Sequence, residues 1–114
     1  MSTKPPECWA SDPQARALRV EISPERSLLL PFDQFTFSEL TSEGKEQRLR
    51  LVFATHEVVV HGHALRRLET VMQRMELSLV ARMPYDLRTV AGDGQPRILE
   101  IIVNENDLGA GPNP

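Results

Sequence analysis

The chain has 114 residues, of which 40% are hydrophobic, and this is enough for one modest domain core. No apolar run approaches the roughly 18–20 residues of a membrane span, and the first ten residues lack the basic start and apolar stretch of a signal peptide. These features argue against a membrane or secreted protein, so we expect a cytoplasmic one. Eleven arginines against two lysines are typical of a GC-rich, bacterial genome.

The net charge of −3 is unevenly distributed along the chain. Residues 47–82 carry a net charge of +3, whereas residues 1–46 and residues 83–114 each carry −3. A basic centre between acidic flanks could attract an acidic partner, or let the flank of one copy meet the centre of another. A solvated mixture of charges explains the same pattern, because surface ion pairs contribute little stability.

Residues 1–14 contain three prolines and few apolar side chains, so we expect an irregular leader. Cys8 is the only cysteine, which excludes an intrachain disulfide, and its place in the leader predicts an exposed thiol. Trp9 is expected to dock on the domain or on a neighbouring subunit, because burial of its ring is favourable.

We expect a single domain at residues 15–104, and its first half shows the pattern of β-strands. Apolar and polar side chains alternate there with a period of two, which is typical of half-buried strands. The segments with this pattern are residues 18–22, 35–37 and 47–54. A short apolar segment at 28–30 runs into Pro31, which favours an edge strand or a strand end. The run TSEGK at residues 41–45 predicts a hairpin turn.

The middle of the chain passes from strand to helix. A tight turn at 55–57 leads into three valines at 58–60, which predict a strand covered on both faces. Gly62 can then take the backbone angles that swing a strand into a helix. Residues 63–75 form the expected helix, whose apolar side chains recur at spacings of three and four. The members of this stripe are Leu65, Leu68, Met72 and Met75.

Two further strands are expected at residues 77–83 and 97–103, joined by a long loop at 84–96. Residues 105–114 form an expected disordered tail, because they have little to bury. The predicted fold is therefore α+β: a mainly antiparallel sheet of about five to seven short strands, with one amphipathic helix packed on it. A small, partly closed β-barrel is the main alternative.

The three histidines are the candidate metal ligands. His61 and His63 lie two residues apart, so on a continuous strand they would share a face and could hold one metal ion. His56 has the opposite strand parity and joins them only if the preceding turn redirects it. A histidine-ligated, metal-dependent enzyme is thus one hypothesis, against the simpler interpretation that these are surface residues and that the protein needs no cofactor.

Five arginines suggest a second hypothesis, contact with nucleic acid or another acidic partner. They are Arg48, Arg50, Arg66, Arg67 and Arg74. Phosphate contacts need little more than such side chains. A pI near 5.6 and an aromatic content of 5% argue against a nucleic-acid binder, which is typically basic and carries aromatic platforms.

No nucleophile elbow and no phosphate-binding loop is found, so an enzyme has no positive support in the sequence. We therefore expect a non-enzymatic binding or assembly module that forms a homo-oligomer, with an unknown protein partner as a further possibility. Sheet edges at the first and last strands and charge blocks of opposite sign favour self-association.

Residues 48–68 (RLRLVFATHEVVVHGHALRRL) resemble the centre of small, uncharacterised bacterial domains. The resemblance lies in a V-x-V-x-G-x-x-L pattern, which here runs from Val58 to Leu65. It covers about a fifth of the chain, and it implies no activity, because no chemistry is assigned to that group.

Overall fold

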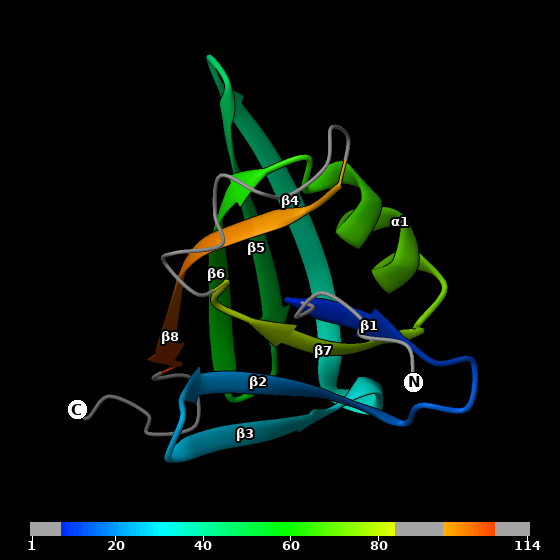
Figure 1. The fold of residues 1–114 in the computed structure, drawn as a ribbon. Helices are drawn as coiled ribbons and strands as arrows, with labels where there is room; N and C mark the ends of the chain where they lie inside the picture. Colours follow the sequence, from blue (N-terminus) through cyan, green and yellow to red (C-terminus); the bar gives the residue numbers. More distant parts are fainter. Residues whose placement is uncertain (1–7, 84–94, 107–114) are drawn as a thin grey trace, which may run out of the picture.

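The computed structural model describes residues 8–83 and 95–106. In these residues eight strands form two four-stranded sheets, accompanied by one α-helix and one short 3-10 helix (Figure 1). The α+β class is confirmed in outline. The strand count is larger than predicted, and the strands form two sheets instead of a closed barrel.

The first sheet, sheet A, has the order β1-β7-β2-β3 and the second, sheet B, the order β4-β5-β6-β8. The strands of sheet A are β1 (Trp9–Ser11), β7 (Leu77–Ala81), β2 (Ala17–Ser23) and β3 (Arg26–Pro31). Those of sheet B are β4 (Phe35–Glu43), β5 (Glu46–Phe53), β6 (His56–His63) and β8 (Arg97–Glu105). The helices are η1 (Phe32–Gln34), which links the two sheets, and α1 (Arg66–Gln73).

Strand pairing in sheet A departs from the expected antiparallel order. β2 pairs antiparallel with β3 but parallel with β7, with Val20 opposite Val80. A parallel pair needs a long crossover, and here β3, three of the four strands of sheet B and the helix lie between the two strands along the chain. Sheet A is therefore mixed.

Part of the expected leader is a strand. Trp9–Ser11 form β1, which pairs antiparallel with β7 at the edge of sheet A. The Ala81 amide donates a hydrogen bond to the Cys8 carbonyl at 2.8 Å. Cys8 is only 2% exposed and belongs to the core, so the prediction of an exposed thiol is wrong. The partner strand that orders this segment, β7, comes from the C-terminal half of the domain.

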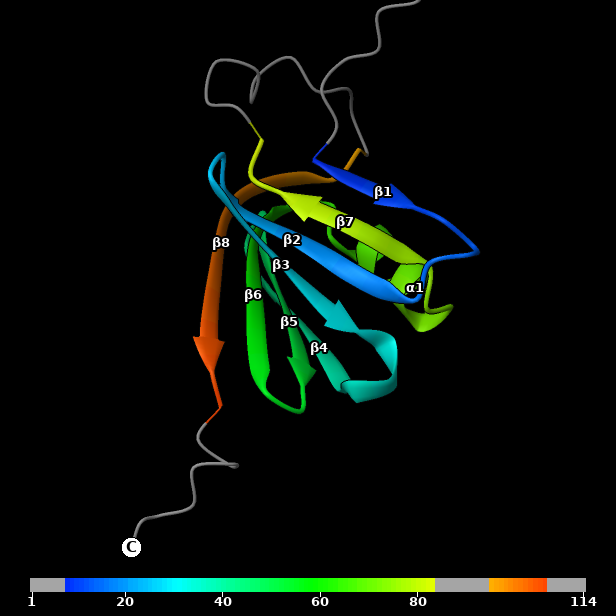
Figure 2. The same ribbon diagram turned by 90° about the horizontal axis from the view of Figure 1, so that it is seen from below.

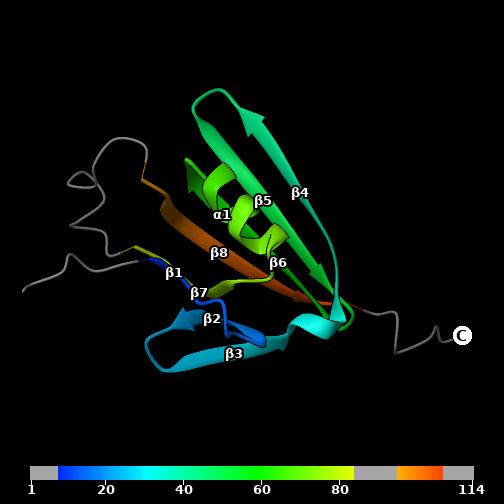
Figure 3. The same cartoon turned by 90° about the vertical axis from the view of Figure 1, so that its right-hand side faces the viewer.

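The hydrophobic core lies between the two sheets, and Figure 3 shows α1 on the side where they open apart. Its largest buried side chains come from both sheets and from the helix: Phe53, Leu18, Leu49, Leu51, Leu65, Leu68, Met72, Leu77 and Ile98. Val58 and Val60 point into this core, while Val59 on the other face is 5% exposed. The three valines are thus covered on both faces, as predicted.

Helix α1 is shorter than the predicted 63–75. β6 continues to His63, and Ala64 then adopts a positive φ of 59°, which turns the chain before the helix begins. The Leu65 amide donates to the Gln47 side-chain oxygen at 2.6 Å, so a residue of β5 satisfies one of the amides at this helix start.

The end of α1 is a Schellman motif. The Met75 amide donates to the Met72 carbonyl at 2.8 Å and the Glu76 amide to the Val71 carbonyl at 3.1 Å. Met75 has a φ of 57° in this turn, which carries its side chain away from the helical stripe. Leu65, Leu68 and Met72 are buried as predicted, but Met75 is 40% exposed, so its predicted burial is wrong.

The predicted loop at 84–96 and the predicted tail at 105–114 lie mostly outside the described residues. Glu105 is an exception, because it is the last residue of β8. No helix among the residues that the structure describes is long and apolar enough to cross a membrane.

Candidate functional site

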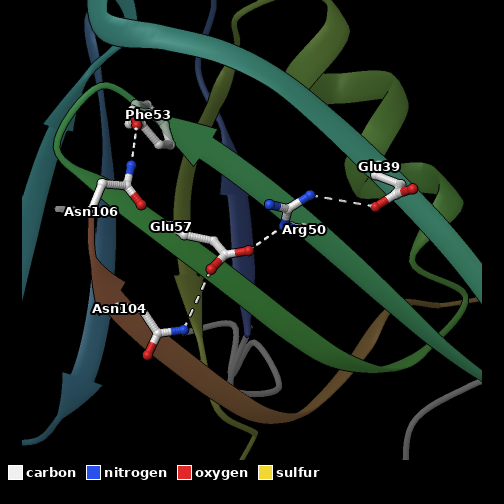
Figure 4. A network of polar contacts seen from close by, with 6 residues as sticks. All are labelled: Glu39, Arg50, Phe53, Glu57, Asn104 and Asn106. Atoms are coloured by element: carbon white, nitrogen blue, oxygen red, sulfur yellow. Dashed lines mark hydrogen bonds and ion pairs between the residues drawn. The ribbon is translucent and has the colours of Figure 1, made fainter. Parts of the chain in front are cut away.

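The face of sheet B that points away from the core is the surface on which most of the candidate residues gather. The strand register places three rows of four side chains across it. We call the following residues the outer face: Phe37, Glu39, Thr41, Arg48, Arg50, Val52, Glu57, Val59, His61, Glu100, Ile102 and Asn104. In Figure 4, sheet A and α1 both lie behind this face.

A polar network crosses all four strands of the outer face (Figure 4). At its centre, Arg50 on β5 donates from Nε to Glu57 on β6. The Arg50 Nη1 lies 3.6 Å from the Glu39 Oε1 on β4, directly opposite in the register. Asn104 on β8 donates to the other Glu57 oxygen at 3.5 Å. One arginine is thus held between two carboxylates of its own chain.

The protonation of this network follows from these contacts. The hydrogen bond from Arg50 is the main cause that lowers the pKa of Glu57 below its ordinary value, and the Asn104 amide and the charges of Arg50 and Arg48 act in the same direction against partial burial. The hydrogen bond to Glu57 is likewise the main cause that raises the pKa of Arg50. Both groups are therefore charged at neutral pH.

We expect Glu57→Gln to lower stability at neutral pH, with an effect that disappears in acid. Because the pKa of Glu57 is lower in the folded chain than in the unfolded chain, its ionised form stabilises the fold above the unfolded pKa. That contribution is lost as the pH falls through the folded pKa. Urea denaturation of the wild type and the variant from pH 7 down to pH 2 measures the difference.

The Arg50→Met background is the matched control for this experiment, because it removes the main cause of the shift. Glu57→Gln should lose most of its pH-dependent effect there. An equal pH-dependent effect with and without Arg50 would contradict the assigned cause.

Two large apolar side chains are exposed on the outer face, Phe37 at 44% and Ile102 at 39%. Phe37 has a partner within the chain, because the Arg50 guanidinium lies 5.4 Å from its ring centroid, within cation–π range. Ile102 lies on β8, the last strand of the sheet, beside its edge.

The three histidines do not meet in one site. His56 bonds to the hydroxyl of Thr55 at 2.7 Å, and His63 contacts the Lys45 carbonyl through Nδ1 at 2.8 Å. His61 lies on the outer face between Arg48 and Glu100. His56 and His61 are five positions apart on the same strand, a span of about 16 Å. Within residues 8–83 and 95–106, no group of three or more histidine, cysteine or acidic side chains is placed to hold a metal ion.

The five candidate arginines are divided between two sides of the molecule. Arg48 and Arg50 lie on the outer face of sheet B, whereas Arg66, Arg67 and Arg74 are on or next to α1, behind that sheet. The Arg67 guanidinium lies 5.9 Å from the ring centroid of Trp9, which docks on the domain as expected. The arginines therefore do not form one continuous cluster.

Sequence reasoning found the basic members of the outer face but missed Glu39, Glu57 and Asn104. Each is a common polar residue in a strand or turn, and only the pairing register places them around Arg50. The alternation on residues 47–54 did put Arg48 and Arg50 on one face. The same alternation in residues 56–61 is obscured, because the three consecutive valines place apolar side chains on both faces of the strand.

Comparisons with known proteins do not add to this description. No protein-family model, no curated protein and no solved structure matches the chain.

Proposed function

We propose that this protein is a non-enzymatic assembly module whose copies associate with one another through sheet B. The observation that carries the proposal is Ile102, a large aliphatic side chain exposed on the outer face at the last strand of the sheet. Ile102 stands between the partly buried Ile101 and Val103 on an edge strand, and an apolar edge strand of this kind can pair with another chain.

Polar side chains on the same face as Ile102 are fixed in position, which favours association. Four polar side chains of the outer face, those of the network around Arg50, are already held by hydrogen bonds and ion pairs across the strands. Binding to such a surface costs less conformational entropy than binding to one whose side chains must first be immobilised.

The other hypotheses have less support. A metal-dependent enzyme needs ligands that converge, and His56 lies far from His61 along β6. Nucleic-acid binding needs unpaired basic groups, yet Arg50 is held by Glu39 and Glu57. The same pairing weakens the idea that one copy's acidic flank binds another copy's basic centre.

The full chain should show the mass of a dimer in light scattering at high micromolar concentration, which is twice its 12.9 kDa. Ile102→Ser should shift the equilibrium toward the monomer, because it removes the apolar contact. Leu29→Ser is the matched control, because Leu29 is 57% exposed but belongs to sheet A.

A wild-type mass of 12.9 kDa at high micromolar concentration in low salt would contradict the proposed function. A dimer that Leu29→Ser weakens and Ile102→Ser leaves intact would show association through sheet A instead.

A further inference from the structure

The edge of sheet B at β8 is open to another strand. β8 has nine residues and, in the part of the chain that the structure describes, pairs with β6 alone, so the far side of its second half has no strand beside it within the sheet. In Figure 2, β8 runs along the outer boundary of the molecule, with β6 on one side of it. A long apolar edge strand can pair with an identical strand of another chain.

The backbone groups that face this edge can be identified from the register. The Asn106 amide donates to the Thr55 carbonyl at 2.9 Å, which continues the antiparallel ladder of β6 and β8 by one pair. Hydrogen-bonded pairs alternate in such a ladder, so Asn104 and Ile102 direct their backbone groups toward β6. Ile101 and Val103 direct theirs to the open side.

These outward groups are unpaired in the part of the chain that the structure describes. The Met83 amide donates to the Ile98 carbonyl at 2.8 Å, so the residues that follow β7 cover the beginning of the edge. Beyond that contact, the described residues supply no further backbone partner for Ile101 or Val103. The open part of the edge therefore coincides with the residues on either side of exposed Ile102.

The other three edges are protected against strand addition. β1 has three residues and an irregular register, and β3 ends in Pro31, which has no amide to donate. β4 carries mainly polar side chains, with Thr36, Glu39 and Thr41 exposed along it. β8 differs, because Ile101, Ile102 and Val103 follow one another in its second half.

We propose that β8 pairs antiparallel with β8 of a second copy about a two-fold axis at Ile102, which joins the two sheets B into one continuous sheet. This inference rests on the proposed function and specifies its interface. Ile101 of each copy exchanges its outward hydrogen bonds with Val103 of the other. Ile102 faces Ile102 in a non-hydrogen-bonded pair, where Cα atoms are about 4.5 Å apart.

In this register the side chains, as well as the backbone groups, lie opposite suitable partners. Ile102 is covered by its own symmetry mate, and Glu100 lies opposite the neutral Asn104 of the other copy. A two-fold axis at Val103 would instead place Ile102 opposite Asn104 and Ile101 opposite Glu105, which pairs apolar with polar groups. The axis at Ile102 also places no like charges directly opposite each other, an arrangement that would be destabilising.

Ile102→Lys is the first test, because it places two cations opposite each other at the axis without changing the ladder with β6. We expect the dissociation constant of the dimer to rise about 100-fold. Phe37→Lys is the matched control: Phe37 is exposed on the same face but lies on β4, at the far edge, and its variant should remain a dimer. Equal urea midpoints under monomeric conditions verify that both variants fold.

Ile102→Cys is the second test. A non-hydrogen-bonded pair has a Cβ separation close to that of a disulfide, so mild oxidation should cross-link most molecules into dimers. Leu29→Cys, exposed at another edge, should cross-link only at background level, and so should the wild type, whose Cys8 is 2% exposed. Val103→Cys tests the alternative axis and should cross-link less than Ile102→Cys.

The outcomes of these experiments distinguish a wrong interface from a wrong proposed function. A wild-type dimer that survives Ile102→Lys, or in which Ile102→Cys cross-links no better than Leu29→Cys, overturns pairing at β8 and leaves self-association intact. Dissociation by Phe37→Lys alone assigns the interface to the outer face away from this edge. A monomeric wild type overturns both the interface and the proposed function.

Discussion

Replacing Gly62 with alanine is expected to lower the free energy of unfolding by about 3 kcal/mol, at the upper end of the usual cost of overpacking. A Cβ at this position would lie 1.8 Å from the carbonyl oxygen of Arg97 and 3.2 Å from the Cα of Ile98. Both are backbone atoms of the paired strand β8, so they cannot rotate away as a side chain would. The strands β6 and β8 must separate locally to admit the methyl group.

Gly44→Ala is the control for this prediction. Gly44 has a φ of 62° in the turn between β4 and β5, and a Cβ there would meet no atom within 4 Å. The cost of Gly44→Ala should be about 1 kcal/mol, which is the penalty of a left-handed backbone alone. Urea denaturation of both variants measures the difference. A Gly62→Ala variant no less stable than Gly44→Ala would show that β8 does not approach β6 so closely.

Leu68→Ala should destabilise the fold by about 3 kcal/mol, because it opens a cavity where α1 meets the core. Leu68 is fully buried at 0% exposure and joins residues of both sheets in one cluster. The helix occupies the side on which the sheets open apart (Figure 3), so the loss affects both of them.

Thr70→Ala on the same helix is the matched control. Its side chain is exposed and bonds only to the Arg66 carbonyl one turn earlier, so we expect a change below about 0.5 kcal/mol. Thermal or urea unfolding gives both values. Equal effects of the two substitutions would contradict the packing of α1 through its apolar stripe.

Local patterns in the sequence were sufficient to predict many elements of this fold. Alternation placed Leu49, Leu51 and Phe53 on the buried face of a strand, and the spacing of Leu65, Leu68 and Met72 identified the buried side of the helix. These patterns work because a strand and a helix each repeat their side-chain directions at a fixed period.

The partners of the strands could not be predicted in the same way. The parallel pair of β2 and β7 joins Val20 to Val80, and β1 is ordered by pairing with that same strand. Such contacts depend on which distant segment lies alongside, and periodicity carries no information about it. For the same reason Cys8 was expected at the surface, although it is buried.

The candidate site, like the fold, could be predicted only in part from the sequence. Sequence reasoning identified Arg50 but could not identify the Glu39 and Glu57 carboxylates that hold it, because only the register brings three strands together there. The spacing of His61 and His63 likewise could not reveal that His63 contacts the carbonyl of Lys45 in the β4–β5 turn.

Hydrogen exchange measured at increasing protein concentration tests self-association through sheet B most directly. As the concentration rises from low to high micromolar, the amides of Ile101 and Val103 should become protected, because they gain partners from a second copy. The amide of Leu29, at the edge of sheet A, should exchange at a constant rate. Exchange at Ile101 and Val103 that is independent of concentration would contradict the account.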